Sequence, residues 1–260
     1  MRTATRMVVL NSKKYVLDLI SAVIAVAYSL RRLYASYTGA TIRVQRSLDD
    51  LQADIGFTAN GDLDTVALLA FVGSGNGFVT TWYDQSGNGR HATQTDPTRQ
   101  PQIVSNGAIE TQNGRPALLF DGNAFFTNIN VSLPQFSVSL VETSIQNTNT
   151  IYYPVGFGVG GISVGGNFHS QKFAINENTS LVSAENSVLN APTILSVGSN
   201  NLGRQISVNG NAPATDATVQ SITQITIGRR SDSFWLFFGL MSEVMFFPSL
   251  LSTTNRQTLE

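Results

Sequence analysis

A short turn after an aromatic strand holds the densest group of chemically versatile side chains. Residues 82–91 read WYDQSGNGRH and combine a carboxylate, two amides, a hydroxyl, a guanidinium and an imidazole. Such groups can bind sugar hydroxyls by hydrogen bonds. A structural explanation is also open, in which Asp84 and Ser86 bind nearby backbone amides and the glycines adopt left-handed conformations. The candidate carbohydrate-binding residues of this turn are Asp84, Asn88, Arg90 and His91.

A second candidate group follows a strand near the C-terminus, in the segment Ser231-Asp232-Ser233-Phe234-Trp235. An indole beside polar groups can stack on a sugar ring while its neighbours bind the hydroxyls. Trp235 fits equally a core position or a subunit contact. We therefore predict carbohydrate binding at Arg229, Asp232 and Trp235.

Acid–base chemistry would require carboxyl groups that converge in space. Retaining glycoside hydrolysis uses two of them, about 5 Å apart. Spacing along the sequence does not pair the acids of the later chain, and each also suits a turn or surface position. These acids are Glu142, Glu177, Glu185, Asp216, Asp232 and Glu243. We predict no catalytic residue from them.

Metal and cofactor chemistry has little support in the composition. The chain has no cysteine and two histidines, His91 and His169, which excludes thiolate and multi-histidine sites. An oxygen-ligand calcium site remains open. We expect no cofactor and no resident metal, with calcium possible but unsupported.

The elements that must position these groups are mostly strands. Apolar residues at three- and four-residue steps predict an amphipathic helix over 21–37, and a second helix is expected over 63–72, capped by Asp62 or Asp64. Asn209-Gly210 is a tight-turn signal. The expected strands are 41–46, 78–83, 117–120, 136–144, 152–156, 172–175, 193–198, 205–208, 224–228 and 237–247. This spacing predicts an antiparallel all-β sandwich, either a meander or a jelly roll.

Length and composition favour one domain with a weakly charged surface. The chain has 260 residues, 13% of them charged, and a formal net charge of -1. Nucleic-acid binding and membrane insertion are therefore not expected. No linker divides the chain, so we predict an N-terminal arm over 1–20 and one sandwich domain over 21–260.

The N-terminus leaves an alternative open. Basic residues precede an apolar run, and Ala25-Val26-Ala27 resembles a signal-peptidase site. Asp18 interrupts that run, which favours an assembly arm over a cleaved leader. An exported protein would be processed near Ala27.

Two families share motifs with this chain. Residues 28–39, 43–47 and 83–89 resemble, in order, the opening of the arabinofuranosidase B catalytic domain. That resemblance implies a concanavalin-like sandwich and retaining hydrolysis by two carboxyl groups beside a pair of adjacent cysteines. Residues 225–230, 237–248 and 250–256 resemble the ending of laminin-G-like and concanavalin-like lectin domains, with Glu243 at an acidic position, and residues 118–122 resemble an early strand and turn of the same family.

The resemblances predict an all-β, antiparallel, concanavalin-like jelly-roll sandwich with a short N-terminal amphipathic helix and minor helices. The cysteine pair and the Met-Glu nucleophile segment of the arabinofuranosidase are not found. We therefore expect a non-catalytic virion structural protein of a bacteriophage, a capsid decoration, head-fibre or tail-fibre component on the virion surface. Its expected partners are other virion proteins, copies of itself and a host-surface polysaccharide. The alternatives are an arabinofuranosidase-like glycoside hydrolase and an extracellular or periplasmic carbohydrate-binding module.

Overall fold

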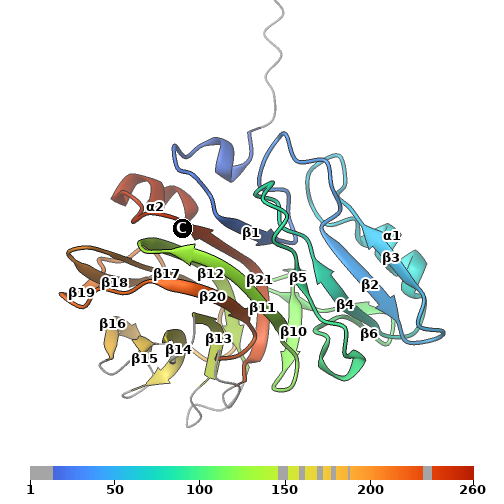
Figure 1. Ribbon diagram of the computed structural model, residues 1–260. Coiled ribbons are helices and arrows are strands. Elements are labelled where there is room, and N and C mark those ends of the chain that lie inside the picture. The colour runs from blue at the N-terminus through green and yellow to red at the C-terminus, as the bar shows by residue number, and fades with distance from the viewer. Residues whose placement is uncertain are drawn as a thin grey trace, which may run out of the picture.

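Two antiparallel sheets stacked face to face form the body of the molecule. The computed structural model describes residues 14–145, 152–157, 162–168, 172–176, 180–186, 188–230 and 236–260. In Figure 1 the smaller sheet lies beneath one half of the larger sheet, and the other half of the larger sheet continues to the right. The predicted all-β sandwich is confirmed.

The larger sheet has 13 strands. Its main path runs β19 (Ala214–Asp216), β18 (Gly203–Val208), β17 (Thr193–Asn200), β12 (Phe136–Ser144), β21 (Phe238–Phe247), β10 (Leu118–Asp121), β6 (Gln102–Ser105), β4 (Gly77–Trp82), β2 (Ile42–Arg46) and β3 (Gln52–Ile55). Three short strands attach beside this path: β1 (Val26–Ser29) on β21, β5 (Ala92–Thr93) on β4 and β7 (Ala108–Ile109) on β6.

The smaller sheet has 6 strands. Its order is β11 (Phe126–Leu133), β20 (Ile222–Ile227), β13 (Tyr152–Phe157), β14 (Ile162–Phe168), β15 (Lys172–Asn176) and β16 (Leu181–Asn186). A separate hairpin pairs β8 (Thr111–Gln112) with β9 (Arg115–Pro116), and the helices are η1 (Val16–Asp18), α1 (Thr65–Val72), η2 (Pro97–Arg99) and α2 (Thr253–Leu259).

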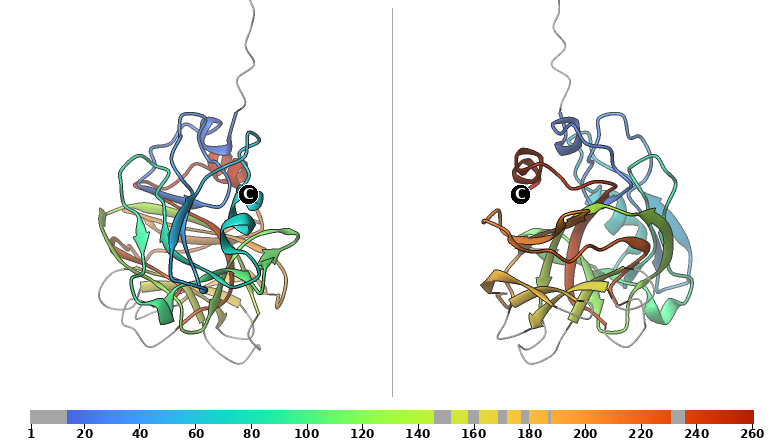
Figure 2. Two further views of the ribbon diagram at one scale, coloured as in Figure 1. Left: turned by 90° about the vertical axis from the view of Figure 1, so that its right-hand side faces the viewer. Right: turned by 60° about the vertical axis from the view of Figure 1, so that its left-hand side comes forward.

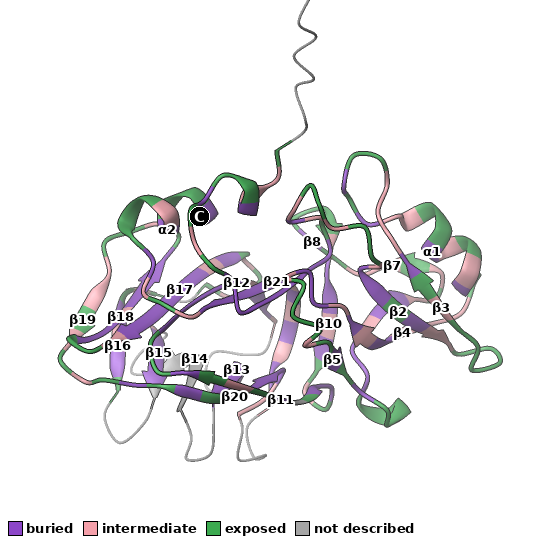
Figure 3. Cartoon of the chain, turned by 45° about the horizontal axis from the view of Figure 1, so that its top comes forward, coloured by how far each residue is buried: buried purple, intermediate pink, exposed green. Residues whose placement is uncertain are grey.

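Strand β21 joins the two halves of the larger sheet. Along one edge it pairs with β12, and along the other it pairs first with β10 and then with β1. Alternate residues of β12 point to opposite faces, so Val138 and Leu140 enter the main core while Ser137 accepts a hydrogen bond from the amide of Leu251 on the other face. Figure 3 shows buried residues along most of β12 and β21.

The predicted helix over 21–37 is wrong, because this stretch contains strand β1. Val26 and Tyr28 pack in the main core, whereas Ala27 between them packs in a second cluster. A helix buries one stripe, but a strand sends alternate side chains to both sides. The amides of Ala25 and Leu30 also donate to carbonyls of β21 or its neighbours. The apolar residues of this stretch therefore pack into two cores, and their three- and four-residue spacing does not reflect a helix.

The other local predictions largely agree with the structure. Helix α1 lies within the expected 63–72, and the Asp64 side chain accepts a hydrogen bond from the amide of Ala67 at its N-terminus. Asn209 and Gly210 both have positive φ, 50° and 78°, as their turn type requires. Helix α2 begins after Ser252, which caps it.

A second, smaller core lies outside the sandwich, where the two ends of the described chain meet. Its buried residues come from the N-terminal segment, β21 and α2: Leu17, Ile20, Ile24, Ala27, Leu33, Met245, Phe247, Leu251 and Leu259. Figure 2 shows α2 and the N-terminal segment at the same end of the molecule. In the part of the chain that the structure describes, no helix has the length and apolar character needed to span a bilayer.

Candidate functional site

The turn after β4 is a clasp built around the Asp84 carboxylate. Asp84 is 2% exposed. Its Oδ1 accepts hydrogen bonds from the amides of Ala27 and Ser86, each 2.9 Å long, and its Oδ2 accepts from the Ser86 hydroxyl at 2.8 Å and the Arg90 amide at 3.0 Å. Every lone-pair direction of a carboxylate is then in use. Asp84 therefore ties the turn to itself and to strand β1.

The neighbouring polar side chains reinforce this clasp. Asn88 Nδ2 and Arg90 Nη1 donate to the Ala25 carbonyl at 3.0 and 2.9 Å, and His91 Nδ1 accepts from the Asp84 amide at 3.1 Å. The imidazole also lies edge-on to the Tyr83 ring, with 5.0 Å between centroids. The turn thus brings four predicted site residues together, and the bonds they make here fix β1.

The buried Tyr28 is a further partner of the clasp, and its pKa is shifted. The Tyr28 hydroxyl donates to the Arg90 carbonyl. Burial, helped by the nearby Asp84 charge, raises the pKa of Tyr28 well above its usual value.

Gln85 adds two further links between the turn and the segment that contains β1, because its side chain accepts from the Leu33 amide at 2.9 Å and donates to the Ser29 carbonyl at 3.0 Å.

The second predicted group lies elsewhere. Arg229 follows β20 in the smaller sheet, and its guanidinium lies 3.8 Å from the centroid of the Phe125 ring. Burial, and then the charge of Arg99, lowers the pKa of Arg229. Asp232 and Trp235 lie outside the described residues. Carbohydrate binding at either group stays a prediction.

Two of the four described candidate acids form ion pairs, whereas Glu142 and Glu185 each have an Oε2 without a hydrogen-bond partner among the described residues. Asp216 pairs with Arg204 at 2.9 Å, and Glu243 pairs with Arg31 at 2.8 Å. Glu177 lies outside the described residues.

Glu142 is the acid of this group whose pKa is raised strongly by burial. It lies on β12 and is 1% exposed. Within the described residues its Oε2 has no hydrogen-bond partner. Burial raises the pKa of Glu142 from 4.5 to about 8, since a charged carboxylate is costly away from water. The group is protonated at neutral pH but closed off from solvent.

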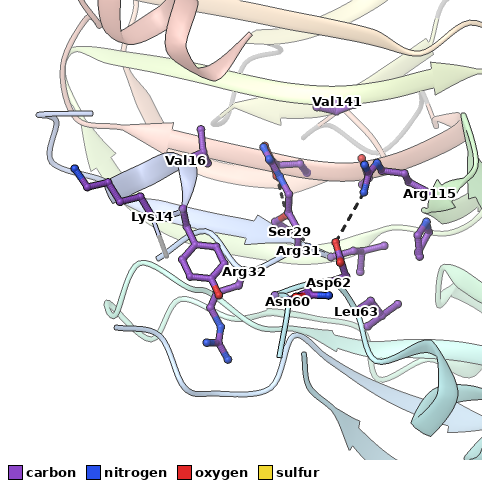
Figure 4. A pocket seen from close by; sticks show the side chains of 16 residues that line it. Lys14, Val16, Ser29, Arg31, Arg32, Asn60, Asp62, Leu63, Arg115 and Val141 are labelled. Carbon is purple, nitrogen blue, oxygen red and sulfur yellow. Dashed lines mark hydrogen bonds and ion pairs between the residues drawn. The ribbon is translucent and has the colours of Figure 1, made fainter. Parts of the chain in front are cut away.

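A cavity of about 490 Å³ opens on the outer face of the larger sheet. Sequence reasoning missed it, because its walls come from segments far apart in the chain. Those walls are the N-terminal segment, the end of β1, the loop at 60–63, β9 and β21. Figure 4 shows Lys14 and Val16 at one side of the cavity and Arg115 at the other, with Asp62 facing Arg115. The volume is in the range of small-molecule sites.

The floor of the cavity is organised around Glu243. This carboxylate, whose side chain is 5% exposed, accepts from Arg31 Nε at 2.8 Å, Arg31 Nη2 at 2.9 Å and the Ser29 hydroxyl at 2.7 Å. The bidentate bond raises the pKa of Arg31. Glu243 was predicted at an acidic position of the closing strand, and the structure gives it a partner two hundred residues away in sequence, which no spacing rule could reveal.

Asp62 is the second carboxylate of the cavity. Its side chain is 62% exposed and lies 3.8 Å from Arg115 Nη1. The residue also forms an antiparallel bridge with Arg31. The cavity therefore brings together two acids of different environment, one fixed and buried and one exposed. Among the described residues, no group of three histidine, cysteine or acidic side chains is placed to hold a metal ion.

Comparison with known proteins relates the first half of the chain to one enzyme family. Residues 21–130 match the family described as Alpha-L-arabinofuranosidase B, catalytic. Alpha-L-arabinofuranosidase B of Aspergillus niger is 40% identical over 75 residues, which cover 28% of this chain and 15% of that protein. The Aspergillus fumigatus protein, a probable alpha-L-arabinofuranosidase B, is 36% identical over 85 residues, or 32% and 17% of the two chains.

Solved structures extend the likeness of fold to almost the whole chain. A GH54 α-L-arabinofuranosidase soaked with a cyclic sulfate inhibitor superposes with a TM-score of 0.75 and 18% identity, over 92% of this chain and 61% of that one. An arabinofuranosidase complexed with arabinofuranosyl-alpha-1,2-xylobiose gives 0.71 and 16% over the same shares. The chain thus spans less than two thirds of these relatives.

These matches correct the functional prediction. The expected non-catalytic virion structural protein, whether a capsid decoration, a head fibre or a tail fibre, is wrong, because both the family match and the curated relatives are arabinofuranosidases. The motifs over residues 28–39, 43–47 and 83–89 all lie within the matched residues 21–130. The matches support the alternative, a glycoside hydrolase.

Proposed function

We propose that this chain is a glycoside hydrolase of the arabinofuranosidase B type, or the greater part of the catalytic domain of one, and that it acts on α-L-arabinofuranosides outside the cell. The match over residues 21–130 carries the proposal. It covers the clasp around Asp84 and three walls of the cavity, namely the end of β1, the loop at 60–63 and β9, whereas Glu243 on β21 lies outside the matched residues.

The cavity supplies the two carboxyl groups that we propose to test first. Retaining hydrolysis uses one carboxylate as nucleophile and one carboxylic acid to protonate the leaving group. Three hydrogen bonds hold the Glu243 carboxylate in a fixed position on the cavity floor, and we propose it as the nucleophile. Asp62 is the other acid that lines the cavity. The whole chain lacks cysteine, so the reaction would proceed without the adjacent cysteines that the resemblance implies.

Release of 4-nitrophenol from 4-nitrophenyl α-L-arabinofuranoside tests the proposal. We expect measurable turnover by the chain, and a loss of about 10²-fold or more in kcat for Glu243→Gln and Asp62→Asn. The control is Asp54→Asn, an exposed acid that pairs with Arg43 at 3.6 Å on another part of the sheet.

The possible outcomes separate the activity from the site. Turnover that survives in both cavity variants, with folding checked by circular dichroism, would move the site to acids outside the described residues, and Glu177→Gln and Asp232→Asn would be tested next. Absence of turnover on this and other arabinofuranosides would reject the hydrolase.

A further inference from the structure

We propose that the cavity on the outer face of the larger sheet binds a carboxylated saccharide, one that carries a uronate residue, through Arg31 and Arg115. The inference deepens the proposed function, because it names the substrate class of the same site. It starts from the charges that line the cavity. Four cations, Lys14, Arg31, Arg32 and Arg115, and two carboxylates, Asp62 and Glu243, line the cavity.

This local excess of positive charge is unusual for the chain. Four cations less two acids leave +2 at the cavity, whereas the whole chain has 16 basic residues and a formal net charge of -1. The cations come from three separate segments, the N-terminal one, the end of β1 and strand β9. A concave site with a net charge raises the local concentration of ligands of the opposite charge.

Arg31 is fixed in position, but Glu243 takes only part of the hydrogen-bonding capacity of its guanidinium. Glu243 fixes the guanidinium by accepting hydrogen bonds from two of its N–H groups, and the Ser29 hydroxyl donates to the same carboxylate. A guanidinium has five such donors, so three remain, and the side chain is 51% exposed. A second anion can therefore bind to a guanidinium whose position is already set, and little conformational entropy is lost on binding.

Arg115 also retains its hydrogen-bonding capacity. Its Nη1 lies 3.8 Å from the Asp62 carboxylate, a distance beyond that of a hydrogen bond. The side chain is 81% exposed. Arg115 can thus move onto a ligand carboxylate, and Arg–carboxylate pairs of this kind are bidentate and charge-assisted.

The rest of the lining fits a sugar ring better than a bare inorganic anion. Tyr15 packs closely over Gly61, since a Cβ atom at that glycine would lie 2.5 Å from the tyrosine Cε1. The Arg32 guanidinium lies between the rings of Tyr15 and Phe57, 5.7 and 5.4 Å from their centroids. An aromatic wall, apolar side chains such as Leu63 and a volume of about 490 Å³ suit a saccharide of one or two residues.

Calorimetric titration with trigalacturonate tests the inference without requiring hydrolysis, since this probe contains no arabinofuranose. We expect binding that weakens as salt is added, that is lost with the fully methyl-esterified trimer, and that falls about tenfold in affinity for Arg115→Gln. The matched control is Arg43→Gln, an arginine with a similarly long ion pair of 3.6 Å outside the cavity, which should leave the affinity unchanged.

Three results would overturn the inference. These are equal binding of the acid and its ester, equal loss of affinity in Arg115→Gln and Arg43→Gln, and binding of inorganic phosphate as tight as that of trigalacturonate. The last would leave a general anion site without saccharide recognition. Failure of the hydrolase is measured separately, by turnover of the neutral aryl arabinofuranoside.

Discussion

The two buried acids Asp84 and Glu142 differ in how far their carboxyl oxygens are hydrogen-bonded. Asp84 is ringed by four donors and fixes a turn. Glu142 has one oxygen without a partner among the described residues and a pKa near 8. Burial disfavours the charged form of Glu142, so its ionisation costs stability in the folded state. Stability should therefore depend on pH through Glu142.

We predict that the protein loses stability as pH rises from about 4.5 to about 8. Glu142 has a folded-state pKa of about 8 against 4.5 when unfolded, so in this window the folded state binds more protons, and the free energy of unfolding falls by about 1.4 kcal/mol per pH unit. Glu142→Gln removes this contribution and should be more stable than the parent above pH 8. Urea midpoints from pH 5 to 9 measure the difference, and identical pH profiles for the variant and the parent would contradict it.

At the scale of elements, the sequence predicts strands well where apolar and polar residues alternate and turns where positive φ is required. Strand β12 and the turn at Asn209-Gly210 agree with expectation for these reasons. Strand β1 was missed, because its residues serve two cores and so lack the polar alternation of a half-buried strand. The sequence also did not predict β3, β6, β11, β14, β16 and β19, or the two-residue strands β5, β7, β8 and β9. Pairing partners, rather than local pattern, decide such cases.

The junction after β20 provides a prediction at this scale. Gly228 has φ +89°, and a Cβ atom there would lie 2.5 Å from Cδ1 of the buried Phe120 and 2.8 Å from the Ala124 carbonyl. Gly228→Ala must therefore displace the core as well as strain the backbone, at a cost of about 3 kcal/mol or more. Gly87, with φ +84° and open space around it, is the control, for which strain alone predicts about 1–2 kcal/mol. Chemical denaturation compares the two, and equal losses would refute the close approach.

At the scale of the whole molecule, the candidate cavity could not be predicted from the sequence. Its walls meet because β1 pairs with β21 beyond β10, an arrangement that joins residues near 30 to residues near 243. The residues of the clasp form a recognisable motif in the sequence, but nothing in that motif indicates that its partner is strand β1. The hydrogen bonds of Asp84 to nearby amides were expected from the sequence, while the long-range pairing that forms the cavity came only from the tertiary structure.

The pairing of β1 with β21 brings the N-terminal segment that contains η1 next to helix α2. A substitution in this segment can therefore test whether it is a peripheral arm. Leu17, from the segment predicted as an arm over 1–20, is 3% exposed and shares the second core with Leu259 near the C-terminus. We expect Leu17→Ala to lower the free energy of unfolding by about 2–4 kcal/mol, because it leaves a cavity between η1, β21 and α2. Leu202→Ala, at a side chain that is 79% exposed, should change it by less than about 0.5 kcal/mol. Unfolding followed by tryptophan fluorescence and by circular dichroism should coincide in both variants, since one cooperative unit holds the segment and the sandwich. If Leu17→Ala were as neutral as Leu202→Ala, the segment would be an arm whose packing adds nothing to the fold.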